Sequence, residues 1–83
     1  MIYFTKHASE KFEILKGHKF FVSKEQVLLV VTNPDMIDSR PPLLIAQRKF
    51  DSTHVLRVVY KKENSVIKII TFYPGRSKKY GQA

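Results

Sequence analysis

Cysteine is absent from the 83-residue sequence, and so are long apolar runs. Without cysteine there can be no disulfide and no zinc site built on thiolates, and this composition fits the reducing cytoplasm, where we expect the protein to reside. The longest apolar run, VLLVV at 27–31, is far shorter than the ~18–20 residues that cross a bilayer. Charged residues also interrupt the first twenty positions, which argues against a secretory signal: Lys6, Glu10, Lys11, Glu13 and Lys16. We therefore expect neither disulfides nor contact with a membrane.

Acidic side chains are scarce. The sequence has 7 acidic residues against 15 lysines and arginines, a formal net charge of +8. A field of this sign and size attracts polyanions, which for a protein means nucleic acid, an acidic partner protein or anionic lipid. The alternative is a basic protein that has no polyanionic partner. The net charge therefore indicates a polyanionic partner but does not distinguish between nucleic acid, an acidic protein and anionic lipid.

The chain is short enough for one domain and one core. Chains of this size bury roughly 60–65% of the surface that their unfolded form exposes. A hydrophobic content of 43%, with six Phe and four Tyr, is sufficient for one core. We expect a single domain over residues 1–83, in which residues 74–83, PGRSKKYGQA, form a basic C-terminal tail.

A first helix is predicted over residues 6–16. Thr5 can act as its N-cap, because the hydroxyl can accept a hydrogen bond from a free N–H group of the first turn. Ala8, Phe12 and Leu15 follow at positions i, i+4 and i+7 and so form one apolar stripe. Gly17 supplies a stop.

A second helix is predicted over residues 24–32. Ser23 and Gln26 have the spacing of a capping box, and Val22 and Val27 are placed as the hydrophobic staple around it. The β-branched residues of VLLVVT favour a strand instead. The element ends at Asn33 in either case, because a residue before proline is disfavoured in the helical region.

The second half of the chain contains runs that are typical of strands. Three of them are rich in β-branched and aromatic residues: LLIAQRKF (43–50), HVLRVVYK (54–61) and VIKIITFY (66–73). Short turns separate them, as in hairpins. MIYF (1–4) and DMIDSR (35–40) can add two shorter strands. We therefore expect an α+β fold in which two N-terminal helices pack on one face of an antiparallel meander sheet of four to five strands.

The register of the last hairpin decides which side chains share a face. If ENS (63–65) forms a three-residue loop, Arg57 lies directly across from Thr71, with Tyr73 two residues farther along the same face. A loop of two or four residues slips the pairing by one and sends Arg57 and Thr71 to opposite faces. In the first register the other face is wholly apolar and packs against the helices: Leu56, Val58, Ile70 and Phe72.

Three short segments, in this order, resemble one known family. FTKHASEKF has a T-x-H-A-x-x-K/R opening, HVLRVVY has a central strand with an arginine, and IITFYP has a terminal T-x-Y-P strand. They are similar to small domains of the RelE/ParE-like toxin superfamily, which belongs to the barnase- and colicin-like ribonuclease folds. The likeness extends along nearly the whole chain and implies a RelE-like fold. Lys11 stands where the opening pattern usually has an arginine.

The resemblance also implies a function. It suggests a toxin-like, metal-independent endoribonuclease that acts on RNA and belongs to a toxin–antitoxin pair, with an acidic antitoxin as its partner. The alternative is a non-catalytic RelE/ParE-like module that binds an acidic antitoxin-like protein or nucleic acid. A third possibility follows from the ParE-like members, which are linked to gyrase. The oligomeric state is not indicated by the sequence.

Metal-independent cleavage of RNA needs a base, an acid and a cation on one face, together with hydroxyl donors. The residues that match are His7, Arg57, Thr71 and Tyr73. His7 and Tyr73 would act as base and acid, in an order that the sequence leaves open. Arg57 would clamp the phosphate, and Thr71 would orient one of its oxygens. Each also has a structural interpretation: His7 as a surface or capping residue, Arg57 as a cross-strand partner of Thr71, and the other two as ordinary strand residues.

Further basic residues and one tyrosine are candidates for binding the RNA backbone and bases. These are Arg48, Lys49, Arg76, Lys78, Lys79 and Tyr80. Stacking of a base on an aromatic ring contributes ~1–3 kcal/mol. A disordered basic terminus is the alternative for the residues of the tail. The three histidines lack the spacing of metal ligands and no carboxylate cluster accompanies them, so we expect neither a metal nor another cofactor.

Overall fold

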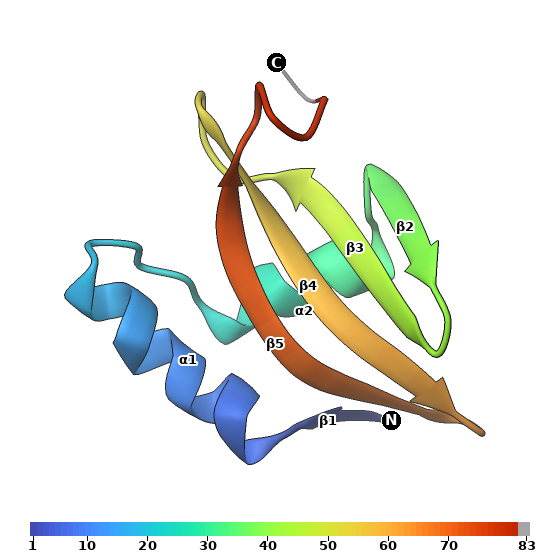
Figure 1. Ribbon diagram of the computed structural model, residues 1–83. Helices are drawn as coiled ribbons and strands as arrows, with labels where there is room; N and C mark the ends of the chain where they lie inside the picture. Colours follow the sequence, from blue (N-terminus) through green and yellow to red (C-terminus); the bar gives the residue numbers. More distant parts are fainter. Residues whose placement is uncertain (82–83) are drawn as a thin grey trace.

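The computed structural model describes residues 1–81 and forms two helices and a five-stranded sheet (Figure 1). The elements are, in chain order, β1 (Ile2–Phe4), α1 (Lys6–Gly17), α2 (Lys24–Thr32), β2 (Met36–Arg40), β3 (Leu43–Lys49), β4 (His54–Glu63) and β5 (Val66–Arg76). The predicted α+β class, with two N-terminal helices followed by the strands, is confirmed. Neither helix is long and apolar enough to cross a membrane.

The sheet is mixed, whereas the sequence predicted an antiparallel one. Its strand order is β1-β5-β4-β3-β2. The strands β2 to β5 form the expected antiparallel meander, but β1 pairs with β5 in parallel, with Ile2 beside Ile67 and Phe4 beside Ile69. No hairpin joins β1 to β5, so no tight turn forces the two strands to run in opposite directions.

Both predicted N-caps are formed. The Thr5 hydroxyl accepts a hydrogen bond from the Ala8 N–H at 3.1 Å. At α2 the capping box is complete: Gln26 N–H donates to Ser23 Oγ at 3.1 Å, and Ser23 N–H donates to Gln26 Oε1 at 2.8 Å. These local bonds are the reason that VLLVVT is helical despite its β-branched residues.

Helix α1 ends at Gly17, one residue beyond the predicted end at Lys16, and the residue that turns the chain is a lysine. Lys19 has φ of 68°, in the left-handed region. The N–H groups of Lys19 and Phe20 donate to the carbonyls of Lys16 and Leu15, at 3.0 and 2.9 Å. This is the Schellman arrangement, in which the left-handed position is usually glycine.

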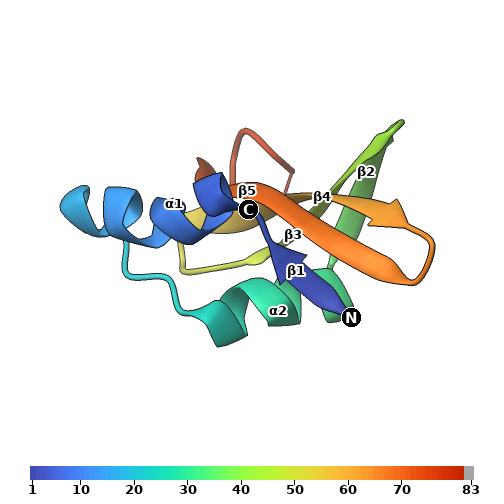
Figure 2. The same cartoon turned by 90° about the horizontal axis from the view of Figure 1, so that it is seen from below.

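One core lies between the helices and a single face of the sheet. Figure 2 shows α2 under the sheet and α1 alongside the β5 edge. Both helices contribute buried residues to the same cluster as the strands, and the Phe12 ring lies 4.7 Å from that of Phe72. Leu56, Val58 and Phe72 face the core as predicted.

The turn between β4 and β5 is shorter than expected. Glu63 pairs with Val66, so the turn contains two residues, Asn64 and Ser65, in place of the three-residue loop. Asn64 has φ of 57°, a conformation that asparagine tolerates in two-residue hairpin turns. With this turn alone, Arg57 and Thr71 would lie on opposite faces.

A β-bulge in β5 restores the shared face. Tyr60 pairs with Ile69 but the next residue, Val59, pairs with Thr71, so Ile70 is the extra residue. Beyond the bulge Arg57 lies directly across from Tyr73, not from Thr71 as predicted. The correction also affects the core: Ile69 is fully buried there in place of Ile70.

The expected end of the last strand at Tyr73 is also wrong. β5 continues through Pro74 and Gly75 to Arg76, and these residues pair with the start of β4. Beyond Thr71 the other side of β5 has no partner strand among the described residues, and proline is tolerated where a strand has a free edge.

Candidate functional site

Three of the predicted catalytic residues lie on the sheet face that points away from the core cluster. Arg57 and Tyr73 are direct cross-strand neighbours, and Thr71 precedes Tyr73 by two residues on the same strand. Because side chains alternate along a strand, all three point to the same side. This shared face depends on the bulge at Ile70.

The fourth residue, His7, reaches this face from the first turn of α1. The Thr5 N–H donates to the Ile69 carbonyl at 3.0 Å, and the Thr5 hydroxyl donates to the Ile70 carbonyl at 3.1 Å. These bonds fix the start of α1 at the bulge. Two residues later, His7 Nε2 lies 3.1 Å from Thr71 Oγ1, in an exposed hydrogen bond.

Arg57 is buried, with only 6% of its surface exposed. Its Nε donates to Tyr73 Oη at 3.1 Å, and Nη1 donates to Gln47 Oε1 at 2.6 Å. Nη2 lies 3.7 Å from the Asp38 carboxylate. All three guanidinium nitrogens therefore have partners, which a charge in this environment requires. A phosphate bound by Arg57 would have to displace one of them.

Gln47 and Asp38 were not identified from the sequence as part of this cluster. Gln47 directly follows the apolar run LLIA (43–46) and pairs with Arg57 across β3 and β4. A buried amide next to such a run was the available signal, because it needs a polar partner. Asp38 lies on β2, which pairs with β3 as the meander implies, but the register that brings Asp38 to the side of Arg57 was not predicted.

The C-terminal residues expected to form a tail are folded, as far as residue 81, against the same face. The Tyr80 ring covers Arg57, whose Cζ lies 4.1 Å from the ring centroid. Gln47 Nε2 donates to the Tyr80 carbonyl at 3.2 Å. In Figure 1 this segment turns back beyond the end of β5. Gln82 and Ala83, the last two residues of the predicted tail, lie outside the described residues.

A hollow of about 480 Å³ lies beside this segment, and two of its cations, Arg76 and Lys78, contribute to the lining. It is lined by Ser52, Thr53, Arg76, Ser77 and Lys78. Arg76, Lys78 and Lys79 are exposed. Ser77 is 4% exposed, and its hydroxyl has no hydrogen-bond partner among residues 1–81.

The loop beside this hollow is closed by Asp51. Its carboxylate accepts hydrogen bonds from the N–H groups of Thr53 and His54, at 2.9 and 2.8 Å. The Thr53 N–H, followed by the contacts with His54, holds the pKa of the Asp51 carboxyl below its usual value. His54 Nδ1 lies 3.0 Å from the same carboxylate, so the His54 side chain is part of the hydrogen-bonded loop.

The two predicted basic residues of β3 point to different faces. Arg48 pairs with Leu56 and therefore lies on the helix side, where its Nη1 donates to the Asn33 carbonyl at 2.7 Å. Lys49 is exposed and alternates to the side of Gln47 and Arg57. Of the two, only Lys49 extends the face that carries the candidate catalytic residues.

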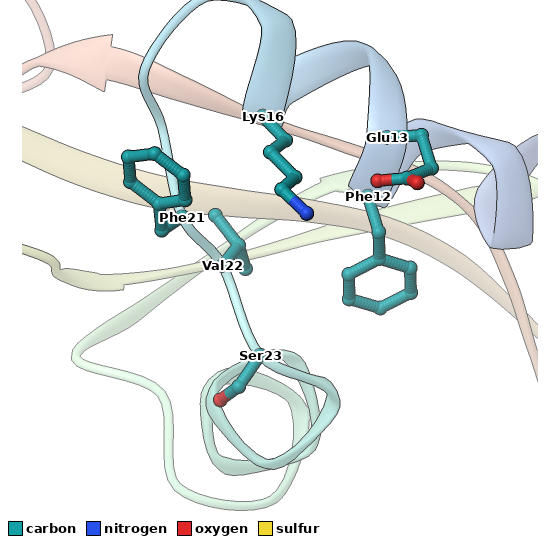
Figure 3. Close-up of a pocket in the computed structure, with 6 residues that line it drawn as sticks. All are labelled: Phe12, Glu13, Lys16, Phe21, Val22 and Ser23. Carbon is teal, nitrogen blue, oxygen red and sulfur yellow. The ribbon is translucent and has the colours of Figure 1, made fainter.

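A second hollow, of about 330 Å³, lies between α1 and the segment that leads to α2. Figure 3 shows its lining, with Phe12, Glu13 and Lys16 on α1 and Phe21, Val22 and Ser23 opposite. The lining includes none of the predicted site residues. Among residues 1–81 no cluster of His, Asp and Glu could hold a metal ion.

Comparison of the chain with protein-family models, with curated proteins and with solved structures finds no match.

Proposed function

We propose that this chain is a RelE-like domain that cleaves RNA in the cytoplasm as a metal-independent endoribonuclease toxin, paired with an acidic antitoxin protein. The observation that carries the proposal is the convergence of His7, from α1, with Thr71 and Tyr73 on one face. These side chains supply the proton-transfer groups that such a reaction needs. The net charge of +8 favours a polyanionic substrate.

In this proposal His7 is the general base. Its imidazole is exposed and oriented by the hydrogen bond to Thr71 Oγ1 at 3.1 Å. It takes the proton of a ribose 2′-hydroxyl while the 2′-oxygen attacks phosphorus. Thr71 then holds the ring and lies beside the reacting phosphate.

Tyr73 is the general acid, because its oxygen must accept the hydrogen bond from Arg57 Nε. A guanidinium has no acceptor, so the phenol proton is left free to be donated elsewhere. It passes to the departing 5′-oxygen as the bond from phosphorus to that oxygen breaks. The products are a 2′,3′-cyclic phosphate and a 5′-hydroxyl. Arg57 thus acts through Tyr73, and not as the phosphate clamp suggested by the sequence.

We place the scissile phosphodiester between His7 and Tyr73. Thr71, to which His7 is hydrogen-bonded, and Tyr73 are two residues apart on one strand, so their Cα atoms lie about 7 Å apart and their side chains point to the same face. A phosphate group between them has its attacking oxygen on the side of His7 and its leaving oxygen on the side of Tyr73. In-line displacement requires these two oxygens to lie on opposite sides of phosphorus.

The proposal is tested by digestion of single-stranded RNA in excess chelator. His7→Ala and Tyr73→Phe should each lower the cleavage rate by about 10²–10⁴-fold, because each removes one positioned proton-transfer group. His18→Ala is the matched control. His18 is also exposed but lies at the far end of α1, about 16 Å along the helix from His7.

Cleavage that persists unchanged in both site variants would overturn the assignment of His7 and Tyr73. A rate that falls equally in His18→Ala would show a general loss of structure.

A non-catalytic module that binds nucleic acid or an acidic antitoxin-like protein is the second candidate. The observation that favours it is the burial of Arg57 beneath Tyr80, which leaves no guanidinium nitrogen free for substrate. RNA that binds but is never cut would support this function and contradict the first.

A further inference from the structure

We propose that the Arg57 guanidinium is a stacking site for a nucleobase, and that the Tyr80 ring occupies this site until RNA displaces it. The inference rests on the proposed interaction with RNA. It adds a base subsite next to the reacting phosphate and gives the C-terminal turn the role of a removable cover.

The Tyr80 ring lies within stacking distance of the Arg57 guanidinium. The Tyr80 ring centroid lies 4.1 Å from Arg57 Cζ, closer than the 5.9 Å of the Tyr73 ring. Arginine planes accept nucleobases in the same way that they accept aromatic side chains. A base in the position of the Tyr80 ring would lie beside Tyr73, whose phenol is the proposed acid.

Gly75 leaves the space that the Tyr80 ring occupies. A Cβ atom at this position would lie 2.4 Å from the Tyr80 ring, so only glycine leaves room for it. Gln47 joins the two parts of the site, since its Oε1 accepts from Arg57 and its Nε2 donates to the Tyr80 carbonyl.

Among residues 1–81, few hydrogen bonds join the turn that carries Tyr80 to the rest of the protein. Besides the bond from Gln47 to the Tyr80 carbonyl, Ser77 N–H donates to the Thr53 carbonyl, and the other backbone bonds of the turn lie within residues 76–80. The buried Ser77 hydroxyl has no partner among residues 1–81, which disfavours the closed position. Arg76, Lys78 and Lys79 are exposed on this turn, so an approaching polyanion meets it first.

The experiment uses Tyr80→Trp as a reporter, because the chain has no tryptophan of its own. In the free protein, the indole introduced at position 80 should be shielded by Arg57. On addition of single-stranded RNA its emission should shift to longer wavelength and its quenching by acrylamide should increase. Tyr3→Trp, on β1 and already exposed, is the control and should show neither change.

RNA affinity gives a second measurement through Tyr80→Ala. Apparent affinity is reduced by the fraction of molecules whose site is covered, so removal of the ring should tighten binding, by roughly tenfold if about one molecule in ten is open. Tyr3→Ala should bind as the parent chain does.

The outcomes separate this inference from the proposed function. RNA that binds while the indole of Tyr80→Trp stays shielded, or weaker binding by Tyr80→Ala, would overturn the stacking site and leave the ribonuclease proposal standing. No binding of labelled RNA to the parent chain would overturn both.

Discussion

At the scale of single residues, Lys19 occupies a backbone conformation that suits glycine better than lysine. Its φ of 68° places its Cβ close to the following carbonyl oxygen, a contact that costs roughly 1–2 kcal/mol for an L-residue with a side chain. The Schellman bonds at the end of α1 hold it there. Because lysine rarely adopts a left-handed conformation, the sequence does not indicate one at position 19. Gly17, two residues earlier, was the more obvious candidate for the end of the helix.

Lys19→Gly should therefore raise the free energy of unfolding by about 1 kcal/mol, since glycine adopts this conformation without strain. Urea denaturation measures the change as a higher midpoint with an unchanged slope. His18→Gly is the control, because His18 has φ of −101° and gains nothing from glycine. An unchanged or lower stability in Lys19→Gly would contradict the argument.

Single residues also show which features of the candidate site could be predicted from the sequence and which could not. Arg57 between two apolar residues indicated a charge that needed partners, and that inference was sound. The identity of the partners was not predictable, because Gln47 and Asp38 are brought to Arg57 by pairing across three strands. Tyr80 was predicted to meet a base, whereas in the free protein it covers Arg57.

At the scale of elements, the start of α1 and the bulge in β5 are one structural unit. The Thr5 hydroxyl accepts from Ala8 N–H, which caps the helix, and donates to the Ile70 carbonyl, which belongs to the bulge. The same hydroxyl therefore connects the helix that carries His7 with the irregularity that turns Thr71 and Tyr73 toward Arg57.

Thr5→Val should lower the free energy of unfolding by about 1–2 kcal/mol, the cost of a lost N-cap, and should also lower RNA cleavage. Thr5→Ser retains the hydroxyl and should preserve both properties. Thermal unfolding and the cleavage rate measure the two effects. Equal losses in both variants would mean that the hydroxyl is not the group responsible.

Elements that are stabilised by interactions between neighbouring residues could be predicted from the sequence, whereas features held by distant residues could not. The helix at 24–32 was predicted with correct bounds, because its capping box lies within four residues of sequence. The bulge at Ile70 was missed, because Thr5, 65 residues away, helps to hold it. The parallel pairing of β1 with β5 was missed for the same reason.

At the scale of the whole molecule, the basic residues are divided between the two sides of the sheet. Arg76, Lys78 and Lys79 are exposed on the turn beside the candidate site, and Lys49 alternates to the same face. Arg48 lies on the opposite side, bonded to Asn33. A polyanion bound at the candidate site should therefore contact only some of the basic residues that produce the net charge of +8.

The affinity for single-stranded RNA should fall linearly with salt on logarithmic axes, because bound phosphates release counterions. Arg76→Ala and Lys78→Ala should each reduce the slope by about 0.7, the contribution of one phosphate contact in single strands. Arg48→Ala should leave the slope unchanged. Fluorescence anisotropy at several salt concentrations provides the measurement, and a slope near zero for the parent chain would contradict a phosphate-based interface.

The bulge in β5 has a consequence for the comparison of related sequences. Residues before and after Ile70 follow opposite inside–outside patterns, and the two-residue turn at 64–65 sets the starting phase. Deletion of Ile70 alone would leave Thr71 opposite Val59 and Tyr73 opposite Arg57, because it removes only the residue that has no cross-strand partner. In an alignment, a gap at position 70 therefore marks the loss of the bulge alone and leaves the residues that face the site correctly assigned.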